Sequence, residues 1–306
     1  MKTLKADPST ECLIIGGGPA GLTAAIYLAR FRRHTILIDA GASRAALIPE
    51  SHNYPGFAAG VSGEKLLAQL REQALRYGAE LRHGRVEKLT LDGDGLFAAE
   101  VQGRVTTARK VLLATGIVDE SPSLPSLKEF IYRGAVRYCP ICDGYEVIDR
   151  RIGIIGPLRG AVEKALFLRT YTADVVLLAL DKDIELAEDE RRALVEAGIP
   201  PPCEPVADVI IANETVVAVM ASGCRVELDA LYPAMGAQVR SELAIALGAR
   251  CNEQQCLIVD SHQRTLVPGL YAAGDVTLDL WQISVATGQA AVAATHIHNS
   301  LEPNYR

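Results

Sequence analysis

Residues 11–21 read ECLIIGGGPAG, a short apolar run followed by a glycine-rich turn. The run predicts a buried strand, and residues 19–32 predict a helix with small side chains facing a sheet. Glycines at 16, 18 and 21 allow a tight turn, a close approach of a pyrophosphate and close helix–strand packing. A second predicted strand, residues 35–38, ends at Asp39, an acid suited to a ribose hydroxyl. This order predicts a dinucleotide-binding Rossmann unit, with a glycine-rich turn lacking a ligand as the alternative.

The composition bounds the class of protein. A chain of 306 residues has room for two domains, and 49 % hydrophobic residues fit an α/β protein with buried central strands. A net charge of −6 argues against a nucleic-acid partner. The uncharged stretch 12–29 is interrupted by the glycine turn, so we predict no membrane span, and the N-terminus lacks the apolar region of a signal peptide. Seven cysteines, five of them scattered singly, indicate a reducing compartment, and we expect a cytoplasmic protein.

The later sequence repeats the same plan. Residues 151–170 predict a second strand, turn and helix, and residues 270–275 predict a strand that returns to the first sheet. We therefore predict an α/β fold of two Rossmann-like domains, the second inserted in the first. The first domain is expected to comprise residues 1–117 and 237–306, and the second 118–236. Four alternating segments, at 79–83, 86–91, 96–101 and 105–108, predict a small antiparallel insertion in the first domain, and residues 111–114 a separate buried strand.

A dithiol opens the second domain. Cys139 and Cys142 are three positions apart, a spacing at which two thiols can close a disulfide within one helical turn, and a helix start lowers a thiol pKa. Asp143 lies next to Cys142, where it can deliver a proton to a leaving thiolate. A zinc site would need a second ligand pair that the sequence lacks, so we predict no metal. An inert buried pair is the other alternative, and the five remaining cysteines read as packing or surface thiols.

Six motifs together resemble one family. Residues 16–21, 53–56, 114–116, 139–143, 274–275 and 282–288 are similar in order and spacing to low-molecular-weight thioredoxin reductases. The resemblance covers nearly the whole chain. It implies a homodimeric FAD protein whose FAD-binding domain is split around a smaller domain that carries the dithiol.

The resemblance also implies roles for single residues. Cys142 would face the flavin, and Cys139 would attack the partner disulfide. The start of the last predicted helix would face the flavin pyrimidine, where a helix N-terminus stabilises the negative charge of a reduced flavin. The implied FAD-binding residues are Gly16, Gly18, Pro19, Ala20 and Gly21 at the pyrophosphate, Asp39 at the ribose, Val86 at the adenine through its main chain, Asn53 near the isoalloxazine, Ala114, Thr115 and Gly116 after a central strand, Gly274 and Asp275 near the ribityl phosphate, and Gln282 and Ile283 at the pyrimidine.

The chain departs from the family where NADPH binds. Family members carry G-x-G-x-x-A followed, after the next strand, by a basic stretch; here residues 156–161 read GPLRGA, and residues 179–185 read ALDKDIE. Leu158 occupies the space of the middle glycine, and carboxylates stand where guanidinium groups would bind the 2′-phosphate. We therefore predict that NADPH is not the reductant, although Arg159 and Gly160 leave room for another nucleotide or anion. Trp281 also differs from the arginine that often precedes the family's glutamine.

The C-terminal tail ends in an aromatic residue after a proline. We expect that Tyr305 stacks on an isoalloxazine, of this or of the partner subunit, with a frayed terminus as the alternative.

These inferences favour an FAD-dependent thiol–disulfide oxidoreductase that does not use pyridine nucleotides. The expected partner is a thioredoxin-like protein or a small disulfide or dithiol, and the donor a ferredoxin-like protein or a reduced flavin. Three alternatives stay open: a dithiol oxidase that uses O₂, a flavin-loaded redox sensor without turnover, and an NADPH-dependent thioredoxin reductase.

Overall fold

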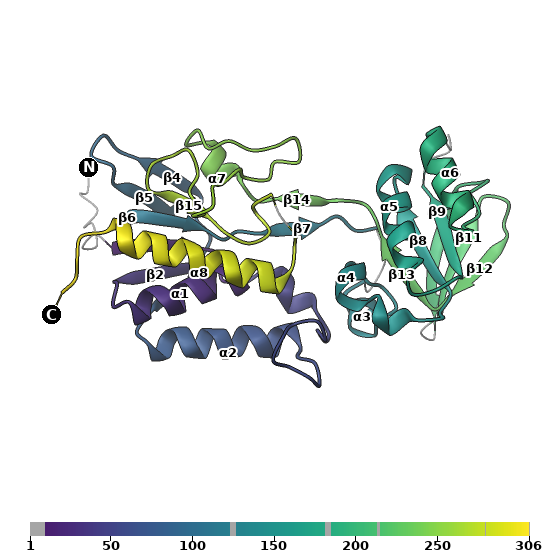
Figure 1. Cartoon of the computed structure of the whole chain (residues 1–306), viewed down its shortest axis with the longest axis horizontal. Helices are drawn as coiled ribbons and strands as arrows, with labels where there is room; N and C mark the ends of the chain where they lie inside the picture. The colour runs from purple at the N-terminus through teal and green to yellow at the C-terminus, as the bar shows by residue number, and fades with distance from the viewer. Residues whose placement is uncertain (1–9, 123–126, 181–184, 213–214, 279, 306) are drawn as a thin grey trace. The chain divides into compact units, whose positions relative to one another are not determined.

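The computed structural model describes residues 10–122, 127–180, 185–212, 215–278 and 280–305, which form two compact units (Figure 1). The first unit contains the described residues up to Ala46, Val61–Val118 and those from Val239 onward. The second contains Leu47–Gly60 and Asp119–Gln238. The chain crosses between the units through β7 (Ile117–Asp119) and β14 (Ala237–Val239), which pair with each other.

The first unit is built on a mixed sheet in the order β3-β2-β1-β6-β5-β4, with β15 also paired to β6. The strands β1, β2, β3, β15 and the second half of β6 run parallel, whereas β4, β5 and the first half of β6 form an antiparallel meander. The apolar run of the glycine motif forms the central strand β1, which is almost entirely buried because both its faces are covered. The strand bounds are β1 Thr10–Ile15, β2 Thr35–Asp39, β3 Glu80–His83, β4 Lys88–Leu91, β5 Phe97–Val101, β6 Arg104–Leu113 and β15 Leu270–Ala272.

Two expectations about this sheet were wrong. Residues 80–83 form β3, a parallel edge strand paired with β2, and do not belong to an antiparallel insertion. The predicted strands at 105–108 and 111–114 form one strand, β6. Arg109 and Lys110 suggested a break between them, but alternate side chains of a strand point to opposite faces, so Arg109 reaches solvent while the backbone continues.

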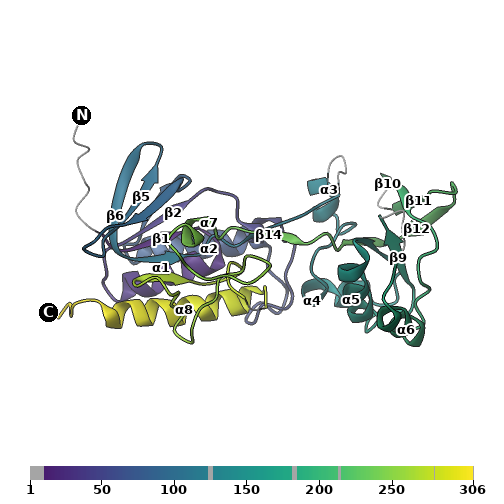
Figure 2. The ribbon, with the colours of Figure 1, turned by 90° about the horizontal axis from the view of Figure 1, so that it is seen from above.

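Small residues allow two helices to pack closely on this sheet. The helices α1 (Pro19–Arg30) and α8 (Ile283–Ser300) lie side by side over one face (Figures 1 and 2). Alanines dominate the buried surface of α8, so the helix axes can approach each other. A third helix, α2 (Gly63–Arg76), packs against α1 and begins at Ser62, whose hydroxyl accepts a hydrogen bond from the Lys65 amide at 3.2 Å. Short elements complete the unit: η1 (Arg44–Leu47) and α7 (Glu242–Ile245).

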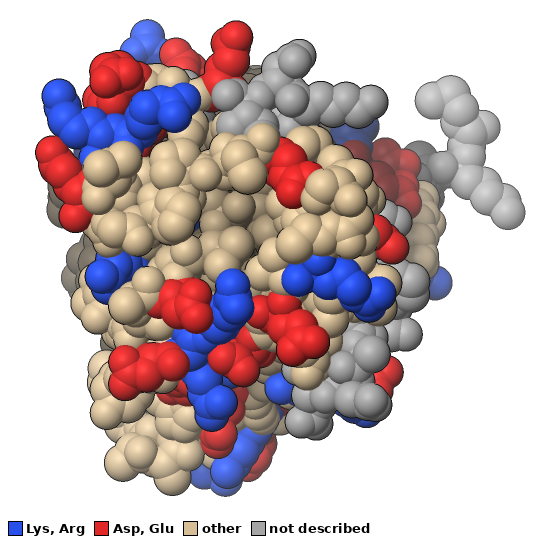
Figure 3. All heavy atoms as spheres, turned by 90° about the vertical axis from the view of Figure 1, so that its right-hand side faces the viewer, with Lys and Arg blue, Asp and Glu red and all other residues tan. Residues whose placement is uncertain are grey.

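The second unit has a parallel sheet between helices and a second sheet. Its three strands lie in the order β13-β8-β9, with α5 and α6 packed on one face and α3, β11 and β12 on the other. On the face of this unit drawn in Figure 3, acidic and basic side chains are interspersed. The bounds are β8 Ile152–Gly156, β9 Val175–Ala179, β10 Val206–Ala212, β11 Thr215–Met220, β12 Arg225–Leu228, β13 Ala230–Pro233, α3 Leu127–Tyr132, α4 Pro140–Asp143, η2 Tyr145–Val147, α5 Leu158–Leu168 and α6 Glu188–Glu196.

No helix among the described residues combines the length and the apolar character that a membrane crossing requires.

Candidate active site

The dithiol of the second unit is present as a disulfide between Cys139 and Cys142, whose Cα atoms are 5.2 Å apart. Cys139 is the N-cap of the one-turn helix α4, and its Sγ accepts a hydrogen bond from the Cys142 amide at 3.1 Å. A hydrogen bond to sulfur favours the thiolate over the thiol. After reduction, the helix start therefore favours a nucleophilic thiolate on Cys139.

The surface around this disulfide is open and apolar. Both cysteines are half-buried, while Ile141 between them is 42 % exposed and Tyr145 after them 75 % exposed. A disulfide partner must reach Cys139 along the line of the bond that breaks. Within this unit, Ile141 and Tyr145 therefore present an apolar surface beside the disulfide.

Asp143 is held from two sides. Its Oδ1 accepts a hydrogen bond from the Tyr232 hydroxyl at 3.0 Å, and its Oδ2 lies 3.3 Å from Nη1 of Arg137. Burial raises the pKa of Asp143, while Arg137 and the Tyr232 hydroxyl act in the opposite direction. Burial and the Asp143 charge also raise the pKa of Tyr232, which keeps its hydroxyl protonated as a donor.

The loop that carries Asn53 belongs to the second unit and contacts the dithiol helix. Asn53 Nδ2 donates to the Ile141 carbonyl oxygen at 3.2 Å, and its Oδ1 lies 3.1 Å from the Ser51 hydroxyl. His52 Nδ1 lies 2.9 Å from a Glu146 oxygen. The proposed flavin contact of Asn53 stays a prediction, since in this structure its amide holds the backbone of the CxxC turn.

The glycine motif of the first unit forms a cradle that side chains would fill. Gly16 has φ +113°, and a Cβ there would overlap the backbone of Ala114, while a Cβ at Gly21 would collide with the Gly16 carbonyl oxygen. The N-cap of α1 is Gly18, with no side-chain cap and no acid in the first turn. The first amides of α1 are therefore open to an anionic ligand, as a pyrophosphate requires.

Two acids beside this cradle are held by arginines that the sequence did not reveal. Asp39 accepts the Gly41 amide at 3.0 Å and the guanidinium of Arg71 at 3.0 Å. Asp275, which follows β15, pairs with Arg44 at 3.3 Å. Neither arginine belongs to a motif, so only their approach in space indicates a role.

The start of α8 has the features of a flavin-binding edge. Gln282 is the N-cap of α8, but its side chain accepts no hydrogen bond from the first amides of the helix. The first turn of α8 contains no acidic residue. The buried indole Nε1 of Trp281 has no hydrogen-bond partner within the described part of the chain. This indole N–H and the first amides of α8 fit the acceptor-rich pyrimidine of a flavin. Behind them, Gln289 on α8 accepts the Gly274 amide at 2.8 Å and so fixes the turn that bears Asp275.

The other predicted cofactor residues also lie in the first unit. Val86 is buried between β3 and β4, and Ala114, Thr115 and Gly116 follow β6. The Thr115 hydroxyl donates to the Arg240 carbonyl oxygen. Parallel strands place their carboxyl ends at one edge, so the residues after β1, β2, β6 and β15 share an edge of the sheet.

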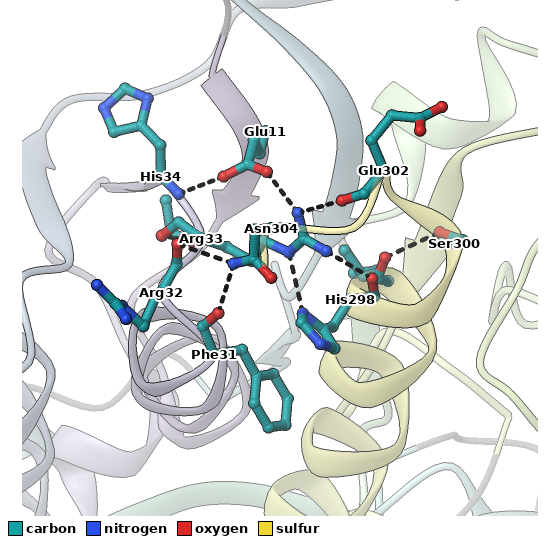
Figure 4. Close-up of polar contacts among 11 residues, drawn as sticks. Glu11, Phe31, Arg32, Arg33, His34, His298, Ser300, Glu302 and Asn304 are labelled. Carbon is teal, nitrogen blue, oxygen red and sulfur yellow. Dashed lines mark hydrogen bonds and ion pairs between the residues drawn. The ribbon is translucent and has the colours of Figure 1, made fainter. Parts of the chain in front are cut away.

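The C-terminal tail is fixed at the opposite end of α8 (Figure 4). The buried guanidinium of Arg33 contacts Glu11 at 2.7 Å, Nδ1 of His298 at 2.9 Å and the Glu302 carbonyl oxygen at 2.8 Å. Asn304 donates to the carbonyl oxygens of Phe31 and Arg32. These contacts direct Tyr305 into solvent, with 91 % of its surface exposed.

A helix of 18 residues is about 27 Å long, so Tyr305 is far from the α8 start of its own unit. Stacking of Tyr305 on a flavin therefore stays a prediction for a partner subunit's flavin only.

The turn before α5 has the backbone conformation of a nucleotide-binding loop, but a side chain fills the space that a nucleotide would occupy. Gly156 has φ +159°, and a Cβ there would overlap Ala234. Leu158 is the first residue of α5 and only 7 % exposed, so its side chain is packed into the protein. The predicted acids Asp181 and Asp183 and the Arg159 side chain lie outside the described residues, and Glu185 is exposed. Within the described ranges, no cluster of His, Cys, Asp or Glu has the size a metal site needs.

The two units together define a class of protein: a flavoprotein oxidoreductase that works with a disulfide. The chain belongs to the pyridine nucleotide-disulphide oxidoreductase family, whose model matches residues 10–294. It is 30 % identical over 301 residues to the bifunctional thioredoxin reductase/thioredoxin of Mycobacterium leprae (strain TN), covering 93 % of this chain but only 64 % of that protein.

Solved structures show the same relationship. The crystal structure of HlmI has a TM-score of 0.88 at 30 % identity and covers 95 % of this chain and 92 % of its own. The atypical thioredoxin reductase TRi from Desulfovibrio vulgaris Hildenborough is 33 % identical with a TM-score of 0.54. The match covers 95 % of this chain and 97 % of the TRi chain. The protein is thus a thioredoxin-reductase-like flavin disulfide oxidoreductase with two Rossmann-like domains.

Proposed function

We propose that this protein is an FAD-dependent thiol–disulfide oxidoreductase that takes its electrons from a donor other than a pyridine nucleotide. The observation that carries the proposal is the contrast within one unit. The dithiol keeps its acid and its open approach, whereas the loop that would receive a nicotinamide dinucleotide contains the buried Leu158.

Electrons would pass between the flavin and the Cys139–Cys142 pair, and FAD would supply the two-electron chemistry when bound. In the reduced pair, the Cys139 thiolate attacks a partner disulfide, and the partner's first thiolate leaves with a proton. Cys142 then attacks the Cys139 sulfur, which restores the Cys139–Cys142 disulfide and releases the second partner thiol. Asp143 is the group beside Cys142 that exchanges the proton.

The cofactor proposal is supported by the cradle at the start of α1 and by the indole N–H of Trp281 just before α8. We propose FAD contacts for the glycine-motif residues, for Asp39 and Asp275, and for the α8 start. Residues 1–117 with 237–306 would form the FAD domain, and 118–236 the domain that carries the dithiol.

The partner would be a thioredoxin-like protein or a small disulfide, and the donor a ferredoxin-like protein or a reduced flavin. Relatives named thioredoxin reductase support the thioredoxin-like partner. We further propose a cytoplasmic homodimer.

A stopped-flow experiment tests the choice of donor. The oxidised holoenzyme is mixed under anaerobic conditions with NADPH, NADH, dithionite or a dithiol while flavin absorbance is followed. We expect bleaching by dithionite and by the dithiol, and an oxidised flavin with either nucleotide. Rapid bleaching by NADPH would reject the nucleotide-independent function.

A second candidate is the reverse direction, oxidation of a small dithiol with O₂ as acceptor, for which Asp143 would serve as the base. The two donors on Asp143 stabilise its carboxylate form, and a carboxylate can accept a proton from a thiol. Hydrogen peroxide released in proportion to the dithiol consumed would establish this direction; its absence would exclude it.

A further inference from the structure

The most unusual feature of the dithiol unit is the enclosure of Asp143. Tyr232 lies in the middle of β13 and is 0 % exposed, yet its hydroxyl points out of the core toward Asp143. The same hydroxyl also lies 3.3 Å from the Asp143 carbonyl oxygen, so it binds both the side chain and the backbone of the residue after Cys142. A phenylalanine would fill this place in the core equally well, so packing alone does not account for the hydroxyl.

Arg137 approaches the other carboxylate oxygen. Its Nε donates to the Gly134 carbonyl oxygen at 3.0 Å, which fixes the guanidinium while Nη1 contacts Asp143. Arg137 and Asp143 are each about one-fifth exposed at their side chains, so water screens this pair only in part. Each oxygen of Asp143 thus has its own donor.

From these contacts we infer that Tyr232 and Arg137 are positioning residues that hold Asp143 as a carboxylate in the disulfide state, so that it takes up a proton only when one of the two contacts opens. This inference rests on the proposed function, because it assigns the proton route of the same thiol–disulfide exchange.

The proton route follows from the atom balance of the resolving step. In the mixed disulfide, Cys139 is bonded to a partner sulfur and Cys142 is a thiol. Cys142 gives its proton to the Asp143 carboxylate and attacks the Cys139 sulfur; the Cys139–partner bond breaks, and the partner leaves as a thiolate. Asp143 then passes the proton to that thiolate, and its two oxygens return to Tyr232 and Arg137. Two electrons move from the dithiol to the partner, and no further reactant is needed.

Other charged groups near Asp143 are few and themselves paired. Glu146 on η2 acts to raise the Asp143 pKa, but it pairs with His52 from the 47–60 loop. Among the described residues, Lys164 on α5 donates its Nζ to the Tyr138 and Pro233 carbonyl oxygens, and the ring of Tyr171 lies against Gly144. Tyr232 and Arg137 are therefore the two described side chains that contact the carboxylate oxygens directly.

The test is the pH profile of a single turnover. Reduced holoenzyme is mixed anaerobically with a small aromatic disulfide whose thiolate product absorbs visible light, at pH values from about 5 to about 9. In the plot of single-turnover rate against pH, the inflection that disappears in Asp143→Asn reports the titration of the Asp143 carboxyl group.

We expect Tyr232→Phe to move this inflection upward by about one pH unit, because a hydrogen bond to the charged form is lost. Arg137→Gln should move it upward by about one to three units, and Arg137→Lys should restore part of that shift. Tyr271→Phe is the matched control, since Tyr271 is also buried but its hydroxyl shares a hydrogen bond with Nδ1 of His296 in the first unit. It should leave the inflection unchanged.

A purely structural role for the two residues would change stability without moving the inflection. Identical inflections in the wild type, Tyr232→Phe and Arg137→Gln would overturn the inference while leaving the proposed function intact. A reduced enzyme that leaves the disulfide unreacted at every pH would overturn the proposed function, and the inference with it.

Discussion

The turns that open α1 and α5 share one backbone plan but differ in what their side chains allow. Both follow a buried parallel strand, and both begin with a glycine at positive φ, Gly16 and Gly156. In the first turn Gly18 leaves the helix start open, while in the second Leu158 occupies the matching position and is buried. A Rossmann turn can therefore be kept for its architecture after the space for a ligand has been filled.

The difference also shows which glycines serve the fold and which serve a ligand. A Cβ at Gly16, Gly21 or Gly156 would overlap backbone atoms, so these glycines are required by the chain itself. A Cβ at Gly18 would meet only the Ser43 hydroxyl oxygen at 3.4 Å, an ordinary contact. The fold itself would therefore tolerate a side chain at position 18. We infer that the glycine is there to leave room for a ligand.

The largest effect should follow from emptying the second turn. Leu158→Gly removes a buried side chain, and we expect the free energy of unfolding to fall by about 3 kcal/mol. Leu75→Gly, at a half-exposed position of α2, is the control for the cost of glycine in a helix, about 1 kcal/mol. Denaturant unfolding measures both variants. Equal losses would mean that Leu158 contributes no burial, and the contrast between the turns would fail.

Filling the first turn should affect the ligand more than the fold. Gly18→Leu should weaken flavin binding by about 30-fold, which corresponds to about 2 kcal/mol of overpacking against the bound dinucleotide. Flavin absorbance per chain and a titration of the apoprotein with FAD give this value. Gly93→Leu, in an exposed turn with no neighbour within 4 Å of a Cβ, should bind flavin normally. Unchanged affinity in Gly18→Leu would remove the proposed pyrophosphate site from this turn.

The smallest effect should come from Gly160, a glycine of the second turn whose replacement by alanine the fold can accommodate. A Cβ at Gly160 would lie 3.5 Å from the Ala234 carbonyl oxygen, and the residue is in the first turn of α5. Gly160→Ala should stabilise the protein by about 0.5 to 1 kcal/mol through helix propensity. Thermal unfolding provides the measurement. A destabilised variant would indicate that the backbone of this turn requires glycine at position 160.

The sequence predicted the fold because its signals are local. The strand, turn and helix that begin at residue 11 and those that begin at residue 151 were both recognised by their apolar runs and glycines. The errors at β3 and β6 occurred where local signals are weak: β3 is a polar edge strand, and β6 contains two charged residues in mid-strand. Propensity cannot tell which neighbour such a strand pairs with.

The dithiol and its acid were also predicted from spacing, and the disulfide was found where expected. Their partners were not. Tyr232 is 89 positions from Asp143, and Arg44 is 231 positions from Asp275, so only the folded chain brings these groups together. In the sequence, a tyrosine within an apolar strand cannot be distinguished from an ordinary core residue. Only the folded structure shows that its hydroxyl has a hydrogen-bond partner.

The division of the first unit has a consequence for synthesis. Its sheet is completed by β15, and its α1 is covered by α8, both of which follow the second unit along the chain. The buried Arg33 likewise receives three of its acceptors from this late segment, two from His298 and one from Glu302. On the ribosome, the edge of β6 and the outer face of α1 must therefore stay uncovered while the second unit is made. Nascent chains from which residue 240 has just emerged should be the form that chaperones recognise, with the dithiol unit able to fold and the first unit still incomplete.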